Sequence, residues 1–348
     1  MNIATNSQSV SDQALKQGQK QPLQSAAVPI NALDVAALCK AAGDPLRIHI
    51  LQLLEQDAFG VLELCRVLEV RQPALSHHLK ILATAGLVTT RREGTYIYYR
   101  RAPREDDGLD DLRQQIFANI DKAELAPDIA ERLLLEQQTR AERSVNFFHS
   151  NAQKFRDQQD LIASYTQYGE LIVQSLDALT WSQSASVLEI GPGEGELLAD
   201  LSSRFDQVIA LDNSSAMLEK SQDFANRKGL ENVRFVCGDT ALAVQSLTSK
   251  DLTPADVVTL NMVLHHTPSP GEIFKDVFHL LNETGILLVT ELCEHDQDWA
   301  REACGDVWLG FDPEALSQWA LAAGLRCGDS QYLALRNGFR IQLRQFYK

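Results

Sequence analysis

The sequence predicts two folded units, a small α+β unit near the start of the chain and a larger α/β unit after it. Residues 61–86 show two helical patterns joined by a short turn, and a β-hairpin pattern follows directly. Residues 186–195 place three glycines at alternate positions between an apolar strand and a helix, a pattern typical of doubly wound parallel sheets. A chain of 348 residues is long enough for two such units.

The chain divides into four segments. Residues 1–28 are rich in Gln, Ser and Ala, and we expect a disordered tail because too little apolar surface is available for burial. Residues 29–103 form the first unit, residues 104–150 a helical dimerisation and linker region, and residues 151–348 the second unit. Since no apolar run approaches a membrane span and no secretory signal is seen, we expect a cytoplasmic protein without membrane contact.

Charge and cysteine usage limit the possible partners. The net charge of -15 disfavours nucleic acid for the chain as a whole, but between Arg71 and Arg101 six cations stand against the single anion Glu93. This basic stretch suits a DNA backbone. The six cysteines include no Cys-x-Cys or Cys-x-x-Cys pair, which favours reduced thiols over disulfides or a zinc site.

Helix start and stop residues organise the first unit. Asn31 caps a helix that ends at Gly43, and Asp44-Pro45 opens a second helix. A third helix over about 61–69 and a fourth from Pro73 to Gly86 form a helix-turn-helix. Its basic composition predicts a DNA-binding unit.

The fourth helix buries Leu75, Leu79 and Leu82, so its opposite side is predicted to face a DNA major groove. Two strands, 87–92 and 95–101, joined by Glu93-Gly94, add a wing. The candidate DNA-binding residues lie at this helix and on the wing: Arg71, Gln72, Ser76, His77, Lys80, Arg91 and Arg92.

Three stretches resemble the ArsR/SmtB family of winged-helix repressors over about residues 31–102. They read Leu-Cys-Lys-Ala-Ala-Gly-Asp-Pro-Leu-Arg, Arg-Gln-Pro-Ala-Leu-Ser-His-His-Leu-Lys and Arg-Arg-Glu-Gly-Thr-Tyr-Ile-Tyr-Tyr-Arg. The resemblance implies a homodimer, paired through the first helix and the helix after the wing. It also implies a double-stranded DNA operator, an inverted repeat with half-sites about one helical turn apart.

The family's metal-binding helix carries Glu-Leu-Cys-x-Cys-Asp, whereas residues 63–68 keep only one thiol, Cys65. A later helix in the family can supply Asp and His ligands, but residues 105–140 of this chain contain no His. A single soft ligand holds a metal weakly, so we expect no metal site. A thiol-based metal or arsenite sensor built on Cys39 and Cys65 is the weakest alternative.

The middle of the chain is helical. Residues 112–120 form a short helix that on family precedent serves the dimer, and the long run after Pro127 suggests an arm between the units. In the helix predicted over 161–179, Tyr165 and Tyr168 can either line a pocket or pack in the core.

Four more strands follow the glycine loop, at 207–211, 232–236, 256–260 and 286–291, and polar residues follow at their carboxyl ends. Asp212 stands 21 positions after Gly191, the spacing of an acid that accepts hydrogen bonds from ribose hydroxyls. The alternation predicts a doubly wound, Rossmann-like sheet, closed by an antiparallel hairpin over 332–348.

These motifs resemble class I S-adenosylmethionine-dependent methyltransferases across about residues 150–348, so the chain is expected to join a winged helix-turn-helix domain to a methyltransferase domain. The resemblance implies S-adenosylmethionine or S-adenosylhomocysteine as cofactor. Its glycine motif falls on Glu189, Gly191, Gly193 and Gly195, its ribose acid on Asp212 and its adenine contacts on Met217 and Asp239. Gly238, Thr240 and Asn261 complete the cofactor-binding set.

The sequence leaves open whether the second unit is catalytic. His265, His266 and His295 are the candidate bases, and a structural role fits each of them equally well. Asn261 is followed by Met262, so the Asn/Asp-Pro-Pro-Tyr signature of amino-methylating DNA enzymes is absent. The aromatic segment 299–311 is either a lid over the pocket or a core element.

The two motif sets together predict a dimeric transcriptional repressor whose second domain binds S-adenosylmethionine or S-adenosylhomocysteine as effector or cosubstrate. The alternative is an enzyme that methylates a small-molecule acceptor and uses its DNA-binding domain for autoregulation.

Overall fold

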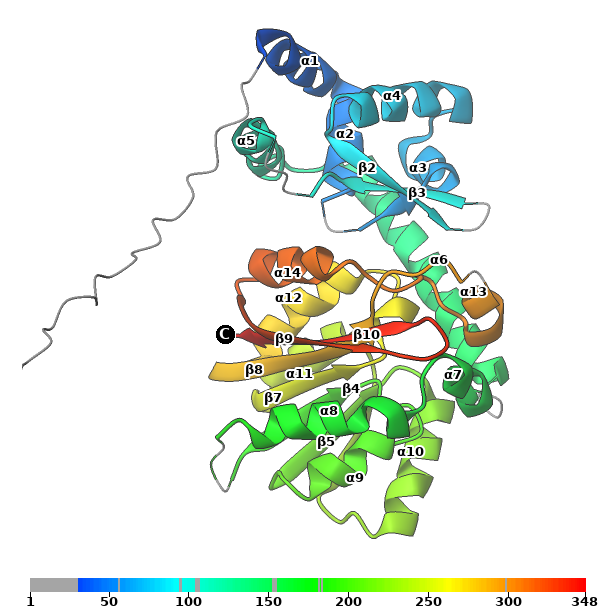
Figure 1. The fold of residues 1–348 in the computed structure, drawn as a ribbon, viewed down its shortest axis with the longest axis vertical. Helices are drawn as coiled ribbons and strands as arrows, with labels where there is room; N and C mark the ends of the chain where they lie inside the picture. Colours follow the sequence, from blue (N-terminus) through cyan, green and yellow to red (C-terminus); the bar gives the residue numbers. More distant parts are fainter. Residues whose placement is uncertain are drawn as a thin grey trace, which may run out of the picture.

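The computed structural model describes residues 31–55, 57–93, 96–103, 107–151, 155–180, 182, 184–297 and 299–348, and it contains two bodies joined by a long helix (Figure 1). The predicted tail, residues 1–28, lies outside the described residues, as does Gly94 of the predicted hairpin turn.

The first body is a winged helix. Its helices are α1 (Ala32–Ala42), α2 (Pro45–Leu53), α3 (Val61–Leu68) and α4 (Gln72–Thr84), and its sheet has the order β1 (Phe59–Gly60), β3 (Tyr96–Arg101), β2 (Val88–Glu93). Both predicted N-caps are present, because Asn31 accepts from the Leu33 amide at 3.0 Å and Asp44 from the Arg47 amide at 3.1 Å. These caps explain where α1 and α2 begin.

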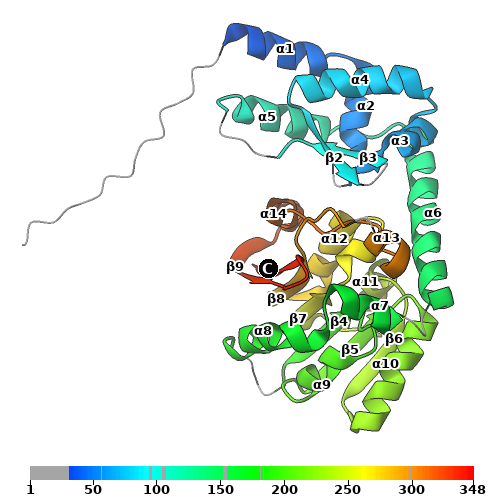
Figure 2. The same cartoon turned by 45° about the vertical axis from the view of Figure 1, so that its right-hand side comes forward.

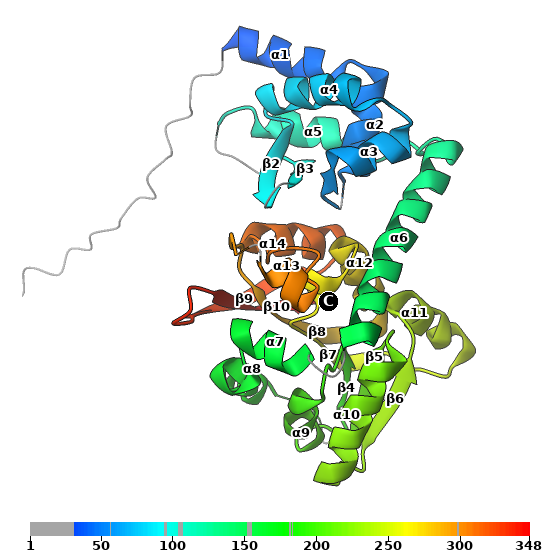
Figure 3. The same cartoon turned by 90° about the vertical axis from the view of Figure 1, so that its right-hand side faces the viewer.

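Helix α4 has one apolar side and one polar side. Leu75, Leu79 and Leu82 are completely buried in the core of this body, which they share with α1, α2 and α3. The exposed side of α4 therefore lies opposite, and in all three views α4 is on the part of the winged helix away from the second body (Figures 1–3).

The connection between the bodies is helical. Helix α5 (Asp110–Ile120) packs on the winged helix, and α6 (Pro127–Asn151) runs along both bodies, contacting α3 at one end and α10 at the other (Figure 3). Helices α7 (Phe155–Ile162) and α8 (Tyr165–Asp177) follow. The predicted arm between the two units is thus α6.

The second body is a seven-stranded sheet in the order β6, β5, β4, β7, β8, β10, β9, in which the first five strands are parallel and β10 is antiparallel to both neighbours. The predicted α/β doubly wound class is confirmed. The strands are β4 (Ser186–Ile190), β5 (Gln207–Asp212), β6 (Val233–Cys237), β7 (Ala255–Asn261), β8 (Leu281–Leu292), β9 (Arg326–Ala334) and β10 (Arg340–Tyr347).

Helices cover both faces of this sheet (Figure 2). Besides α8, they are α9 (Glu196–Ser202), α10 (Ser215–Lys228), α11 (Thr240–Ser249), α12 (Pro270–Leu280), α13 (Trp299–Cys304) and α14 (Pro313–Ala322), with a 3₁₀ turn, η1, at Leu264–His266. Two separate apolar clusters result, one on each face. Among the described residues, no helix is both long enough and apolar enough to cross a bilayer.

Candidate functional site

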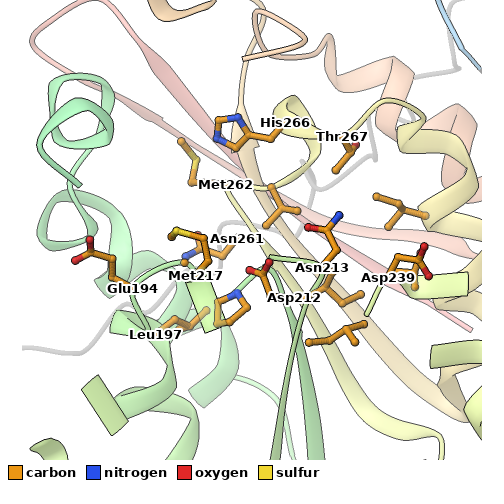
Figure 4. Close-up of a pocket in the computed structure, with 18 of the residues that line it drawn as sticks. Glu194, Leu197, Asp212, Asn213, Met217, Asp239, Asn261, Met262, His266 and Thr267 are labelled. Atoms are coloured by element: carbon orange, nitrogen blue, oxygen red, sulfur yellow. The ribbon is translucent and has the colours of Figure 1, made fainter. Parts of the chain in front are cut away.

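A cavity of about 330 Å³ opens at the carboxyl ends of the parallel strands, where β4 and β5 meet β7. Figure 4 shows residues from several loops converging on it, with Asp212, Met217 and Asn261 among them and His266 at its edge. This is the position in open α/β sheets where ligands bind, because helices on both faces leave a crevice there.

The glycine loop after β4 forms one wall. Gly191 has φ of +68°, and a Cβ there would stand 2.6 Å from Val263 Cγ2. Gly193 also has positive φ, +58°, but nothing lies within 4 Å of the position of a Cβ. Glycine is therefore needed at Gly191 for packing, whereas at Gly193 its missing side chain leaves open space at the cavity wall.

Gly195 and Glu189 were predicted to bind cofactor, but neither lines the cavity. Gly195 is the N-cap of α9, and a Cβ there would meet the Ser221 backbone at 3.2 Å, so it lets α9 and α10 approach. Glu189 is completely buried within β4, opposite Thr259 of β7, because β4 is a central strand of a sheet that is covered on both faces. Burial, with the charge of Asp212, raises the pKa of Glu189 to about 8.

Asp212 ends β5 inside the cavity, as predicted. Its Oδ1 accepts a hydrogen bond from the Ser214 amide at 2.8 Å, which fixes the carboxylate at the start of α10. Burial raises the pKa of Asp212 to about 6. Met217, which is buried on α10, adds an apolar wall beside it.

The loop after β6 also lines the cavity, through Gly238, Asp239 and Thr240. Asp239 caps α11 by accepting from the Leu242 amide at 2.8 Å, and the Thr240 hydroxyl donates to Asp276 at 2.6 Å. These contacts give both side chains a structural role in addition to their place at the cavity.

Asn261 and the residues after it form the far wall. Met262 has φ of +56°, a left-handed conformation that is unusual for a bulky residue and that is often found at functional sites. His266 lines the same wall, and burial next to His265 lowers its pKa well below the usual value. His266 is therefore neutral near pH 7.

The other two candidate bases do not line the cavity. His265 is completely buried, with Nδ1 2.5 Å from Glu291 Oε1. His295 packs edge-on against Phe339, and burial lowers its pKa to about 4. The segment 299–311 is not a lid either, because Trp308 and Phe311 belong to the core and none of its residues lines the cavity.

Some residues that line the cavity were not among the site residues predicted from the sequence. Glu194 lies in the glycine loop, Thr267 and Ser269 follow η1, and Gln159 comes from α7. The sequence left the roles of Tyr165 and Tyr168 open, and both line the cavity in the structure. The Tyr165 hydroxyl also donates a hydrogen bond to Asp200 at 2.7 Å.

Five predicted DNA-binding residues are exposed on or beside α4: Arg71, Gln72, Ser76, His77 and Lys80. On the wing, Arg92 is exposed, but Arg91 is not. Arg91 instead binds the second body, donating to the Gly310 carbonyl at 2.8 Å and to the Leu309 carbonyl, with Glu294 at 3.2 Å. In this arrangement of the two bodies the Arg91 side chain binds the second body, and its contact with DNA stays a prediction.

A second interdomain contact is centred on Arg140 of α6, whose side chain is 4% exposed. It binds both carboxylate oxygens of Glu63 on α3, and it donates at 3.2 Å to the carbonyls of Ala58 and Pro268. Its guanidinium also stacks over Trp308, at 5.3 Å from the ring centre. Since Pro268 lines the cavity, one side chain touches both the cavity wall and the winged helix.

Comparison with known proteins identifies both bodies. A family model for "Bacterial regulatory protein, arsR family" matches residues 44–90, and one for "Methyltransferase domain" matches residues 182–323. The chain is 29% identical over 106 residues to the tRNA 5-carboxymethoxyuridine methyltransferase of Escherichia coli, which covers 30% of this chain but only 39% of that enzyme. This chain therefore matches less than half of the length of that enzyme.

A solved structure of similar fold is the 1,6-didemethyltoxoflavin-N1-methyltransferase of Burkholderia thailandensis, with bound 1,6-didemethyltoxoflavin and S-adenosylhomocysteine. The TM-score is 0.47 at 20% identity, covering 65% of this chain and 92% of that one.

The winged helix has a relative in the biofilm growth-associated repressor of Agrobacterium fabrum. The two are 40% identical over 88 residues, which is 24% of this chain and 75% of the repressor. The chain therefore belongs to the arsR family of bacterial regulatory proteins, with a methyltransferase domain fused behind its winged helix.

Proposed function

We propose that the chain is a dimeric, cytoplasmic repressor whose operator affinity is set by S-adenosylmethionine or S-adenosylhomocysteine in the methyltransferase domain. The cavity residues fit this nucleoside. Asp212 would accept hydrogen bonds from the ribose hydroxyls, Met217 would pack on the adenine, and the open side of Gly193 would let the ligand approach the backbone.

The proposed DNA-bound form is a homodimer on an inverted repeat. Helix α1 supports this, because it exposes apolar residues including Leu33, which is 74% accessible in the single chain. A second copy would cover this surface and place two α4 helices about one helical turn apart.

The contact between cavity and winged helix carries the regulatory part of the proposal. Residues 267–269 line the cavity, Arg140 binds the carbonyl of Pro268, and the Trp308 indole donates to the Thr267 carbonyl at 2.7 Å. A ligand that moves this loop would shift the Arg140 contacts with Glu63 of α3. Regulation requires that the two ligand states differ in affinity for the DNA-competent arrangement.

Operator titration tests this proposal. An operator selected from random duplexes should bind the full chain with an affinity that changes at least fivefold on saturation with one of the two nucleosides, the lower end of typical allosteric coupling, about 1 kcal/mol. Fluorescence anisotropy would measure it, and identical curves in all ligand states would reject the proposal.

The control is the double variant Lys80→Ala with Arg92→Ala. It should weaken operator binding and reduce the slope of log affinity against log salt by about 2, because two phosphate contacts are lost. Its affinity for the nucleoside should not change. Loss of both activities would mean that the two functions are not divided between the bodies as proposed.

Nucleoside affinity should also depend on pH. Only the ionised carboxylate of Asp212 accepts hydrogen bonds at both oxygens, because protonation turns one oxygen into a donor, so binding to both ribose hydroxyls stabilises the ionised form. In the free protein burial raises the pKa of Asp212 to about 6. Affinity for S-adenosylhomocysteine is therefore expected to be constant at higher pH and to fall by up to about tenfold per pH unit below 6. Calorimetry across this range measures it. In Asp212→Asn, affinity should be weak and should lack this dependence, and an unchanged profile would contradict the role of Asp212.

Methyl transfer is the second candidate function, and the position of His266 at the cavity wall favours it. His266 could accept the proton of an acceptor hydroxyl or amine as the methyl group is transferred. Mass spectrometry would detect conversion of S-adenosylmethionine to S-adenosylhomocysteine in the presence of a small-molecule acceptor.

A further inference from the structure

Three buried side chains beside the cavity form a group with the composition of a metal site. They are His265 and His266 of η1 and Asp306, which precedes α14, and one ligand atom from each lies within 4.8 Å of the others. All three residues are buried, but His266 also lines the cavity, so the group borders the ligand-binding space.

The separations within this group are too long for hydrogen bonds. Asp306 Oδ1 lies 3.9 Å from His265 Nε2 and 3.6 Å from His266 Nδ1. Two ligand atoms that each lie about 2.1 Å from a tetrahedral ion are about 3.4 Å apart, so a small adjustment would place an ion between them. His265 Nε2 is buried and has no hydrogen-bond partner among the described residues.

A carboxylate contacts the His265 ring nitrogen that faces away from Asp306 and orients the ring. Glu291, at the end of β8, has Oε1 2.5 Å from His265 Nδ1, and the same oxygen accepts from the Leu292 amide at 2.6 Å. In the tautomer whose Nδ1–H donates a hydrogen bond to Glu291, Nε2 carries the lone pair on the side toward Asp306. Metal-binding histidines commonly have this arrangement, a carboxylate on the nitrogen away from the metal.

Two buried carboxylates, Glu291 and Asp306, flank the imidazole of His265, at 2.5 Å and 3.9 Å from its two ring nitrogens. A group with this charge attracts a cation rather than an anion.

We propose that His265, His266 and Asp306 bind a divalent first-row transition-metal ion, with Zn²⁺ as the reference ion, and that the remaining coordination position opens toward the cavity. Two imidazoles and one carboxylate suit zinc or iron(II), whereas magnesium and calcium prefer oxygen ligands only. The site is distinct from the family's thiol-containing metal site, and it does not depend on the proposed nucleoside regulation. An acceptor or effector with an oxygen or nitrogen donor could complete the coordination.

The experiment uses the full chain freed of metal with a chelator and titrated with ZnCl₂ by calorimetry and with Co²⁺ by absorption spectroscopy. We expect one ion per chain. Cobalt should give visible d–d bands without the near-ultraviolet charge-transfer band that a thiolate ligand produces, because no cysteine takes part.

Variants separate this site from adventitious binding. Asp306→Asn and His266→Ala should lose stoichiometric binding, and Glu291→Gln should weaken it by about 10-fold to 100-fold, as changes behind a metal ligand do. The double variant Cys39→Ser with Cys65→Ser should bind like the unmodified chain. Circular dichroism would show which variants fold, and Glu291→Gln serves if a ligand variant does not.

Two results would overturn the proposal. One is the absence of any saturable ion binding by the metal-free chain. The other is binding that is lost in the cysteine variant but unchanged in Asp306→Asn, His266→Ala and Glu291→Gln.

Discussion

Replacing Arg140 with alanine is expected to lower the free energy of unfolding by about 3–5 kcal/mol, the cost of leaving a buried charge without its partner. The charge left without its partner would be that of Glu63, whose carboxylate is 15% exposed and accepts a hydrogen bond from the Gly60 amide at 2.7 Å. Urea unfolding followed by circular dichroism would measure the loss.

Arg132→Ala on the same helix is the matched control. Arg132 pairs with Asp128 and Glu69, both largely exposed, and donates to the Val67 carbonyl at 2.6 Å, so its loss should cost about 1–2 kcal/mol. Adding Glu63→Gln to Arg140→Ala should recover part of the stability, because a neutral amide is less costly to bury than a carboxylate. Equal destabilisation by the two arginine variants would show that the Arg140 contacts are not needed to hold the bodies together.

Arg140→Ala also bears on regulation. At a temperature where the variant stays folded, its operator affinity should no longer respond to the nucleoside, although each ligand still binds. A response of full size would mean that coupling follows another route, and the proposed repressor function would still stand.

Replacing Gly193 with alanine is expected to weaken S-adenosylhomocysteine binding by about 100-fold. The added methyl group would take up open space at the wall of the cavity, where nothing else lies within 4 Å, and overpacking of this kind costs up to about 3 kcal/mol. Calorimetry at constant pH would measure the affinity.

Gly229→Ala controls for backbone strain. Gly229 ends α10 with φ of +68°, also has open space around a Cβ, and lies outside the cavity. Both variants should lose about 1–2 kcal/mol of stability through the left-handed backbone, but only Gly193→Ala should lose the ligand. Equal nucleoside affinity in the two variants would contradict the placement of the ligand against the glycine loop.

Much of the site could be predicted from the sequence because most of its residues belong to short motifs at strand ends. A glycine loop after a strand, and acids or amides at strand ends, come together at one edge whenever parallel strands share a sheet. Asp212, Met217, Asp239 and Asn261 therefore reach the cavity as expected. Glu189 does not, because it lies inside β4, where its side chain is enclosed by the sheet and its covering helices.

The three candidate histidines could not be ranked from the sequence. His265 and His266 are consecutive residues of a 3₁₀ turn, yet the side chain of His265 lies in the interior and that of His266 lies at the cavity wall. The surroundings of the two histidines include Glu291 and Asp306, which are distant in sequence and come close to them only in the folded chain.

The sequence by itself determined the two domain types and the glycine loop, because caps, helical periods and strand ends are properties of short segments. Only the tertiary structure decided the roles of the wing arginines. Arg91 and Arg92 point to opposite sides of one strand, as consecutive strand residues must, but the sequence does not say what covers each side. In the folded chain the second body covers Arg91 and leaves Arg92 exposed, so the first arginine joins the domains and its neighbour lies at the surface.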